Sequence, residues 1–346
     1  GYNNFVELAY VRMMRSDYDS NMVKNYRNAV EKYIVPLAES LKLRQKQRLG
    51  LKTLKYYDEP LKFLTGNAVP KGDASDILEK AKKMYGELSK ETDEFFTFML
   101  QNELMDLISK KGKASGGYCT YISKYKSPFI FSNFNGTSGD VDVLTHEAGH
   151  AFQAYCSRHY EVPEYIFPTY EAAEIHSMSM EFLAWPWMEL FFKEDELKYK
   201  FSHLASAIIF IPYGVTVDEF QHFVYENPDA SPLERKDKWR KIEKKYLPSR
   251  DYEDNDFLNR GGFWFKQSHI FSVPFYYIDY TLAQICALQF WHKSNENREK
   301  AWEDYLNLCK KGGSKSFLEL VKEANLNNPF AVSYTHLRAH ETLANL

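Results

Sequence analysis

Two histidines and a glutamate in this chain have the spacing of a hydrolytic metal site. His146, Glu147 and His150 lie in the stretch VLTHEAGHAFQAY. On a helix, residues four positions apart share one face, so both neutral imidazoles can bind one zinc ion from the same side. The carboxylate of Glu147 can then accept a proton from a zinc-bound water without itself being a ligand. The pattern therefore indicates metal-assisted hydrolysis.

A catalytic zinc needs a third protein ligand and one open position. The next predicted helix, about Thr169–Phe192, offers the carboxylates of Glu171, Glu174 and Glu181. Glu174 and Glu181 are seven positions apart and share a face, while Glu171 and Glu174 are neighbours at i, i+3. Periodicity leaves the choice open: one carboxylate is the ligand, and another can orient a ligand imidazole through a hydrogen bond. His176 is two positions from Glu174 and should point elsewhere.

Water attack on an amide also needs a donor for the developing oxyanion. The segment GGFWFKQSHIFSVPFYYIDYTLAQ supplies His269, Tyr276, Tyr277 and Tyr280. A helix is predicted to begin near Pro274, which puts Tyr276 and Tyr280 at i, i+4 with hydroxyls on one side. Tyr277 is three positions from Tyr280 and is an alternative. Packing in the core is the competing interpretation for each of these rings.

Most of the chain is predicted to be helical. The helix that carries His146 and His150 runs from about Val141 to His159 and is capped by Asp140. Apolar periodicity and end signals predict further helices over Asp17–Leu49, Asp73–Lys90, Glu91–Lys111, Glu194–Phe210, Val217–Asn227, Pro232–Tyr246, Tyr276–Lys293 and Asn297–Lys310.

One region has the composition of strands. Residues Tyr118–Phe134 contain aromatic and β-branched runs that predict a small hairpin or pair of edge strands. The fold class expected is therefore mainly α, with a small β-sheet beside the HExxH helix. Because no linker long enough to divide domains is present, residues 1–330 are expected to form one catalytic domain.

The composition excludes several classes of protein. Lys and Arg number 44 against 47 Asp and Glu, so no basic excess points to nucleic acid or an anionic membrane. The four cysteines are widely spaced without a CxxC pair, which favours a reducing compartment and a cytoplasmic location. The longest apolar run, near Ala205–Ile211, is too short for a transmembrane helix. No GxGxxG, phosphate-loop or GxSxG motif is present.

Taken together, the motifs resemble those of the zinc oligopeptidases of the thimet oligopeptidase and oligoendopeptidase F family. The resemblance extends from Gly1 to about Phe330. It is carried by GGYCTYI, PFIFSNFNGTSGDVDVLTHEAGHAFQ, EIHSMSMEF, HIFSVPFYYIDYTLAQ and GGSKSFLEL. These stretches are much more specific than HExxH alone.

The resemblance implies a helical, zincin-type catalytic domain with one zinc per chain. Its metal ligands match His146, His150 and Glu174, and its general base matches Glu147. Transition-state donors of the family match His269, Tyr280 and either Tyr276 or Tyr277. Family members cleave internal bonds of short peptides in a deep channel. The strand near Phe129–Phe134 is then expected to be an edge strand that pairs with the substrate backbone.

Two departures from the family pattern lead to further expectations. Family members carry a sizeable region before the position of Gly1, so the chain is expected to be an N-terminally truncated catalytic region. The final stretch, AVSYTHLRAHETLANL at residues 331–346, does not follow the family and is expected to be a non-native tail.

Two other functions compete with an endopeptidase. A zinc carboxypeptidase or dipeptidyl carboxypeptidase would need a cation for the terminal carboxylate of its substrate, and Arg250 or Arg260 is a candidate. A helical peptide-binding protein with a structural or vestigial metal site would need no hydrolysis. The intact Glu147 argues against that second alternative, because a structural site does not use a free carboxylate.

Overall fold

A computed structural model describes residues 1–331 of the chain, which group into two compact units. Of the described residues, the first unit comprises Gly1–Asn67, Ser202–Ile285 and 327–331, and the second comprises Ala68–Phe201 and Cys286–Leu326. Each unit is assembled from segments that are distant in sequence, which a search for a linker does not detect. Of the predicted tail 331–346, all but Ala331 lies outside the described residues.

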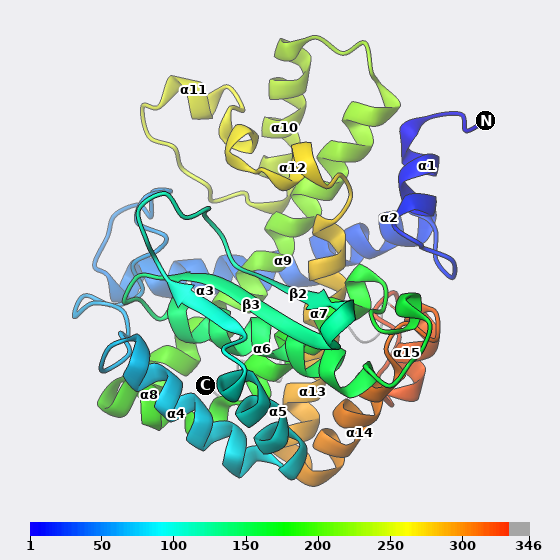
Figure 1. Ribbon diagram of the computed structural model, residues 1–346. Coiled ribbons are helices and arrows are strands. Elements are labelled where there is room, and N and C mark those ends of the chain that lie inside the picture. Colours follow the sequence, from blue (N-terminus) through cyan, green and yellow to red (C-terminus); the bar gives the residue numbers. More distant parts are fainter. Residues whose placement is uncertain (332–346) are drawn as a thin grey trace. The chain divides into compact units, whose positions relative to one another are not determined.

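The second unit is mainly helical, with a three-stranded sheet that lies against α6 (Figure 1). Its helices are α4 (Ala74–Leu88), α5 (Lys90–Gln101), α6 (Gly139–Ser157), α7 (Tyr170–Leu183), α8 (Met188–Phe192), α14 (Arg298–Lys311) and α15 (Phe317–Glu323). This mostly helical fold with a small sheet is the one predicted.

The sheet contains the predicted hairpin and one strand that was not predicted. Strands β2 (Tyr118–Ile122) and β3 (Ser127–Phe134) pair antiparallel. Strand β1 (Met105–Ile108) pairs with β3 in parallel, so the predicted helix Glu91–Lys111 is wrong beyond Gln101, over nearly half of its length. Helix α5 ends at Gln101, and the following residues gain backbone hydrogen bonds from β3 that local propensity does not reveal.

The predicted edge strand is in fact the central one. The strand order is β1-β3-β2, so Phe129–Phe134 lies inside β3 with a neighbour on each side. The edges of the sheet are β1 and β2. The prediction was wrong because strand order depends on β1, which comes from a segment read as helix.

Helix α6 begins differently from the prediction. Its N-cap position is Ser138, without a side-chain cap, and Asp140 is the second helical residue. The Asp140 carboxylate accepts hydrogen bonds from the backbone N–H groups of Asn135 and Gly136, at 2.9 and 2.7 Å. It therefore fixes the turn between β3 and α6 rather than capping the helix.

The predicted helix Thr169–Phe192 is interrupted. Helix α7 ends at Leu183, residues Trp185–Trp187 form a 3₁₀ turn, and α8 follows. Pro186 lacks the N–H that would continue the helical hydrogen bonds, which accounts for the break.

The first unit is helical. Its elements are α1 (Phe5–Arg12), α2 (Ser20–Ala29), α3 (Val35–Arg48), α10 (Pro232–Tyr246), α11 (Asp256–Asn259) and α12 (His269–Ser272), with most of α9 (Glu196–Glu226) and the start of α13 (Tyr277–Glu296). A π-helical turn over Val30–Ile34 joins α2 to α3 just before Pro36, so the predicted helix Asp17–Leu49 is continuous apart from this widening.

The predicted break between Phe210 and Val217 is absent, because α9 runs through Pro212 and Gly214. The Thr216 hydroxyl donates to the Pro212 carbonyl at 2.8 Å. At Gly214 a Cβ would lie 2.2 Å from the Thr281 side chain on α13, so glycine permits close packing of these two helices.

The stretch Tyr170–Glu226, which holds α7, α8 and α9, contains a window that is long and apolar enough to cross a membrane. In the structure, 61% of that window is buried. This is weak evidence for a membrane segment, because core helices of soluble proteins meet the same criterion.

The aromatic core around α6 gives a first prediction. Phe152 is fully buried, with ring centroids 5.4 Å from Phe95 and 5.8 Å from Trp302. Phe152→Ala should lower the free energy of unfolding by about 3–5 kcal/mol, as measured by chemical denaturation. The control Leu197→Ala removes an exposed side chain of the same unit and should cost under about 0.5 kcal/mol. If Phe152→Ala lowered the free energy of unfolding no more than Leu197→Ala does, the result would contradict this packing.

Candidate metal centre

Helices α6 and α7 bring together the three side chains predicted to bind a metal. His146 and His150 lie one turn apart on α6, with ring centroids 5.1 Å apart. The Oε2 atom of Glu174 on α7 is 3.2 Å from His146 Nε2 and 3.5 Å from His150 Nε2. One ligand atom from each of the three lies within 4.8 Å of the others.

This donor set fits a zinc ion. Ligand atoms about 2.0–2.2 Å from a tetrahedral zinc lie about 3.4 Å from each other, close to the two histidine–carboxylate distances. Two imidazoles and one carboxylate are also a ligand set of catalytic zinc. The side chains of His146 and His150 are 21% and 15% exposed, while that of Glu174 is 2% exposed. The histidine side of the group is therefore accessible for a further ligand.

Two residues of α7 hold the predicted ligands in place. Glu181 Oε1 lies 2.7 Å from His146 Nδ1, so its carboxylate can accept the N–H of the ligand ring and direct Nε2 toward Glu174. Ser177 donates its hydroxyl to Glu174 Oε2 at 2.8 Å. Of the three carboxylates that the sequence left open, Glu174 is in the ligand group and Glu181 is behind a ligand. Ser177 was missed, although its i+3 spacing from Glu174 was visible in the sequence.

The electrostatics of the group favour a cation between the helices. Burial opposes charge on Glu174, but His150 and His146 lower its pKa well below the usual range. Burial also opposes charge on His146, while hydrogen bonds with Glu174 and Glu181 hold its pKa well above the usual value. The two carboxylates thus attract positive charge at the imidazole nitrogens, where a divalent ion would be bound.

The predicted base lies beside the start of β2. Glu147 is buried at 7% exposure, and burial raises the pKa of its carboxyl group even though His146 and His150 oppose the shift. A Cβ on Gly117, next to Tyr118, would lie 3.5 Å from Glu147 Oε1. The carboxylate therefore faces the segment that leads into β2.

A glycine sets the separation of α6 and α7. A Cβ on Gly149 would lie 2.6 Å from the carbonyl oxygen of His176 and 2.7 Å from Ser177 Cα, both backbone atoms of α7. Only a residue without a side chain allows this approach. Since His150 is the next residue along α6, the same approach brings Glu174 to the histidines.

His176 points away from the ligands, as its spacing predicts. Its Nδ1 atom lies 3.6 Å from the Cys309 sulfur, and its ring packs against Tyr305. Burial, with a smaller effect from His150, lowers the pKa of His176 to about 3. The ring is therefore a neutral core residue.

The other predicted catalytic side chains form a cluster in the first unit. The His269 ring centroid is 6.1, 5.1 and 6.0 Å from those of Tyr276, Tyr277 and Tyr280. Gln267 Nε2 lies 2.9 Å from His269 Nδ1 and holds that ring. The predicted metal ligands belong to the second unit, so the predicted action of these residues on the same substrate stays a prediction.

Both arginines considered for a substrate carboxylate have acidic partners. Arg250 lies 2.9 Å from Glu59, with 10% of its side chain exposed. Arg260 lies 2.7 Å from Asp256 on the surface. These pairs give no support to a terminal-carboxylate site.

Comparisons with known proteins agree on one family. The family profile described as peptidase family M3 matches residues 1–338. An oligoendopeptidase F homolog of Borreliella burgdorferi is 25% identical over 339 residues, 92% of this chain. Among solved structures, PZ peptidase A with an inhibitor matches 100% of the chain at 64% identity and TM-score 0.97. A candidate oligoendopeptidase F of Bacillus anthracis matches 99% at 62% identity and TM-score 0.91.

The chain spans little more than half the length of these proteins. It covers 55% of the Borreliella burgdorferi protein, 62% of PZ peptidase A and 59% of the Bacillus anthracis protein. The family match ends at residue 338, inside the stretch 331–346 that was expected to be a non-native tail.

The close approach of α6 and α7 gives a second prediction. Gly149→Ala forces a methyl group against the α7 backbone, so it should destabilise the fold by about 1–3 kcal/mol and weaken metal retention. The matched control is Gly139→Ala on the same helix, where the added Cβ meets only the Thr137 hydroxyl at 3.3 Å. Chemical denaturation and metal analysis of both variants test this. If the two variants had equal unfolding free energies and equal metal contents, α6 and α7 would not need a glycine at position 149.

Proposed function

Because the chain belongs to peptidase family M3, we propose that it carries the catalytic centre of a zinc-dependent oligoendopeptidase that cleaves internal bonds of short peptides. The observation that supports this most strongly is the group His146, His150 and Glu174, with the carboxylate of Glu147 on the same helix. The oligoendopeptidase F homolog and PZ peptidase A support the reaction class by their names.

The chemical role of each residue in this centre follows from its side chain. Zinc held by His146, His150 and Glu174 would supply Lewis acidity toward the peptide carbonyl and the attacking water. Glu147 accepts the proton of that water and returns it to the nitrogen of the leaving amine. Its raised pKa suits the first step, because a more basic carboxylate accepts the proton of water more readily.

The cluster of His269 and the tyrosines is proposed to supply the donors for the oxyanion. Tyr280 and either Tyr276 or Tyr277, with His269, are proposed to hydrogen-bond the oxygen as negative charge develops on it. Burial raises the pKa of Tyr277 to about 12, so its hydroxyl keeps its proton and can donate at neutral pH.

The substrate is proposed to pair with β2 rather than with β3. Strand β2 is an edge of the sheet, and no further strand pairs with it in residues 1–331. Its first residues follow Gly117, which faces Glu147. An extended peptide added at this edge would place its backbone beside the base through main-chain hydrogen bonds.

The base gives a third prediction. Glu147→Gln should abolish hydrolysis of an N-acetylated, C-amidated peptide, by at least about 1,000-fold in kcat, because no carboxylate then takes the proton of water. Zinc content should be unchanged, since Glu147 is not in the ligand group. Chromatography of the products and elemental mass spectrometry provide the two readouts.

The outcomes separate the alternatives. The control Glu161→Gln, on an exposed turn, should behave as the parent chain. Cleavage of only unblocked peptides would favour a carboxypeptidase. Peptide binding without zinc-dependent cleavage by the parent chain would favour a peptide-binding protein. Loss of zinc in Glu147→Gln would show that this residue is a ligand.

The carboxylate behind His146 gives a fourth prediction. Glu181→Gln removes the charge that orients the His146 ring, so zinc affinity should fall about 10- to 100-fold in a chelator competition. Glu189→Gln, on the exposed side of α8, is the control and should leave the affinity unchanged. Equal affinities for the two variants would rule out a supporting role for Glu181.

A further inference from the structure

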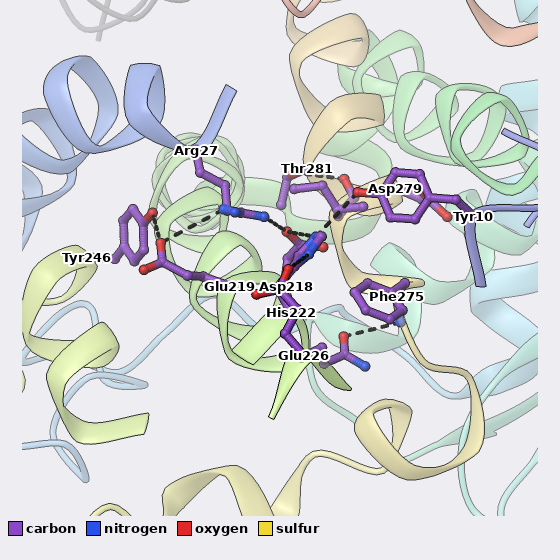
Figure 2. A network of polar contacts seen from close by, with 12 residues as sticks. Tyr10, Arg27, Asp218, Glu219, His222, Glu226, Tyr246, Phe275, Asp279 and Thr281 are labelled. Atoms are coloured by element: carbon purple, nitrogen blue, oxygen red, sulfur yellow. Dashed lines mark hydrogen bonds and ion pairs between the residues drawn. The ribbon is translucent and has the colours of Figure 1, made fainter. Parts of the chain in front are cut away.

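A buried arginine holds the chain at the start of α13. Arg15, which follows α1, places Nη2 2.6 Å from Asp279 Oδ1 and 2.6 Å from the carbonyl oxygen of Phe275. The side chains of Arg15 and Asp279 are both fully buried. Figure 2 shows Asp279 and Phe275 within the surrounding polar network. One guanidinium group thus binds the backbone before the helix and a carboxylate in its first turn.

The backbone at Phe275 adopts a conformation that needs support. Its φ is +68°, in the left-handed region that non-glycine residues rarely occupy. Arg15 binds the carbonyl group of Phe275, and the backbone N–H of Phe275 donates to Gln221 Oε1 at 3.3 Å. Its ring packs against His222 and Tyr225, with centroids 5.0 and 5.5 Å away. Both polar groups of this strained residue are therefore fixed.

Of the two points held by Arg15, one lies just before the tyrosine cluster and the other lies within it. Phe275 directly precedes Tyr276, and Asp279 lies between Tyr277 and Tyr280. The rings of Tyr276 and Tyr280 are 4.8 Å apart, so they move with this turn of the chain. A shift of the Phe275 carbonyl or of Asp279 would change the direction of these hydroxyl groups.

A gain in folding stability does not by itself explain why Arg15 and Asp279 form a buried ion pair. Two buried charges lose hydration, and apolar replacement of such pairs is often neutral or stabilising. The Arg15 guanidinium is instead held firmly, with its centre 4.5 Å from the Tyr10 ring centroid and 5.6 Å from that of Tyr18. Burial raises the pKa of Asp279 to about 6 although Arg15 lowers it, so the carboxylate charge depends on this arginine.

We propose that Arg15 is a positioning residue, which binds the Phe275 carbonyl and the Asp279 carboxylate and thereby fixes the hydroxyls of Tyr276, Tyr277 and Tyr280 for catalysis. The proposal rests on the peptidase function proposed above. The Phe275 backbone and the Asp279 carboxylate link Arg15 to these rings, so its contribution should pass through the tyrosines.

The experiment is a double-mutant cycle with a matched buried pair as control. Arg15→Lys keeps the charge but not the planar fork, so kcat should fall about tenfold or more with KM within about twofold. In a Tyr280→Phe background, Arg15→Lys should lower kcat further by less than about threefold. Arg27→Lys alters another buried pair of this unit, Arg27–Asp218 at 2.5 Å, and should leave kcat within about twofold.

A second readout does not depend on activity. In NMR spectra of the chain with ring-labelled tyrosine, Arg15→Lys should shift the Tyr276, Tyr277 and Tyr280 resonances, and Arg27→Lys should not. Asp279→Asn keeps the shape of the side chain and should give the same shifts and kcat loss. If the parent chain shows no zinc-dependent hydrolysis, the proposed function fails while the spectra still test the positioning.

Three outcomes would overturn the proposal. The losses from Arg15→Lys and Tyr280→Phe could multiply in full, which would mean that the two residues act independently. Arg27→Lys could reduce kcat as much as Arg15→Lys, which would indicate a general effect of buried charge. Arg15→Lys and Asp279→Asn could both fail to fold while Arg27→Lys folds, which would assign the pair a structural role.

Discussion

The candidate centre depends on the close contact between α6 and α7 at Gly149. One helix carries both histidines and the other carries the acidic ligand, so no spacing along either helix can assemble the group alone. The contact is possible because position 149 has no side chain, and it places Glu174 within hydrogen-bond distance of His146. Ser177 and Glu181 on α7 then fix the carboxylate and the imidazole that meet there.

Burial of so many ionisable groups is unfavourable unless their charges compensate one another. In the second unit, the Glu174 carboxylate faces the imidazoles of His146 and His150, which a divalent cation would also bind, and the Glu181 carboxylate faces His146 alone. In the first unit, Arg15 with Asp279 and Arg27 with Asp218 pair within hydrogen-bond distance. Both units thus keep compensated charge in their interiors: the second unit does so at the predicted metal ligands, and the first in two buried ion pairs, of which Arg15–Asp279 lies beside the predicted transition-state donors.

The sequence predicted what is local and missed what depends on distant partners. The α6 helix, the β2–β3 hairpin and the mostly helical fold follow from patterns within short windows. Strand β1 was read as helix because its four residues become a strand only by pairing with β3. That error also hid the central place of β3 in the sheet. The contact of Arg15 with Asp279 joins residues 264 positions apart, which no single-sequence pattern reports.

The choice of Glu174 shows the same limit in the site itself. Periodicity left three carboxylates of one helix open, and a family resemblance was needed to select one. The structure places Glu174 against Nε2 of both α6 histidines and Glu181 against Nδ1 of His146. The most direct test of the central claim is the zinc content of the purified chain and of Glu174→Ala, by elemental mass spectrometry. The account predicts about one zinc per chain, lost in the variant; a folded chain without zinc, or a variant that keeps it, would contradict the account.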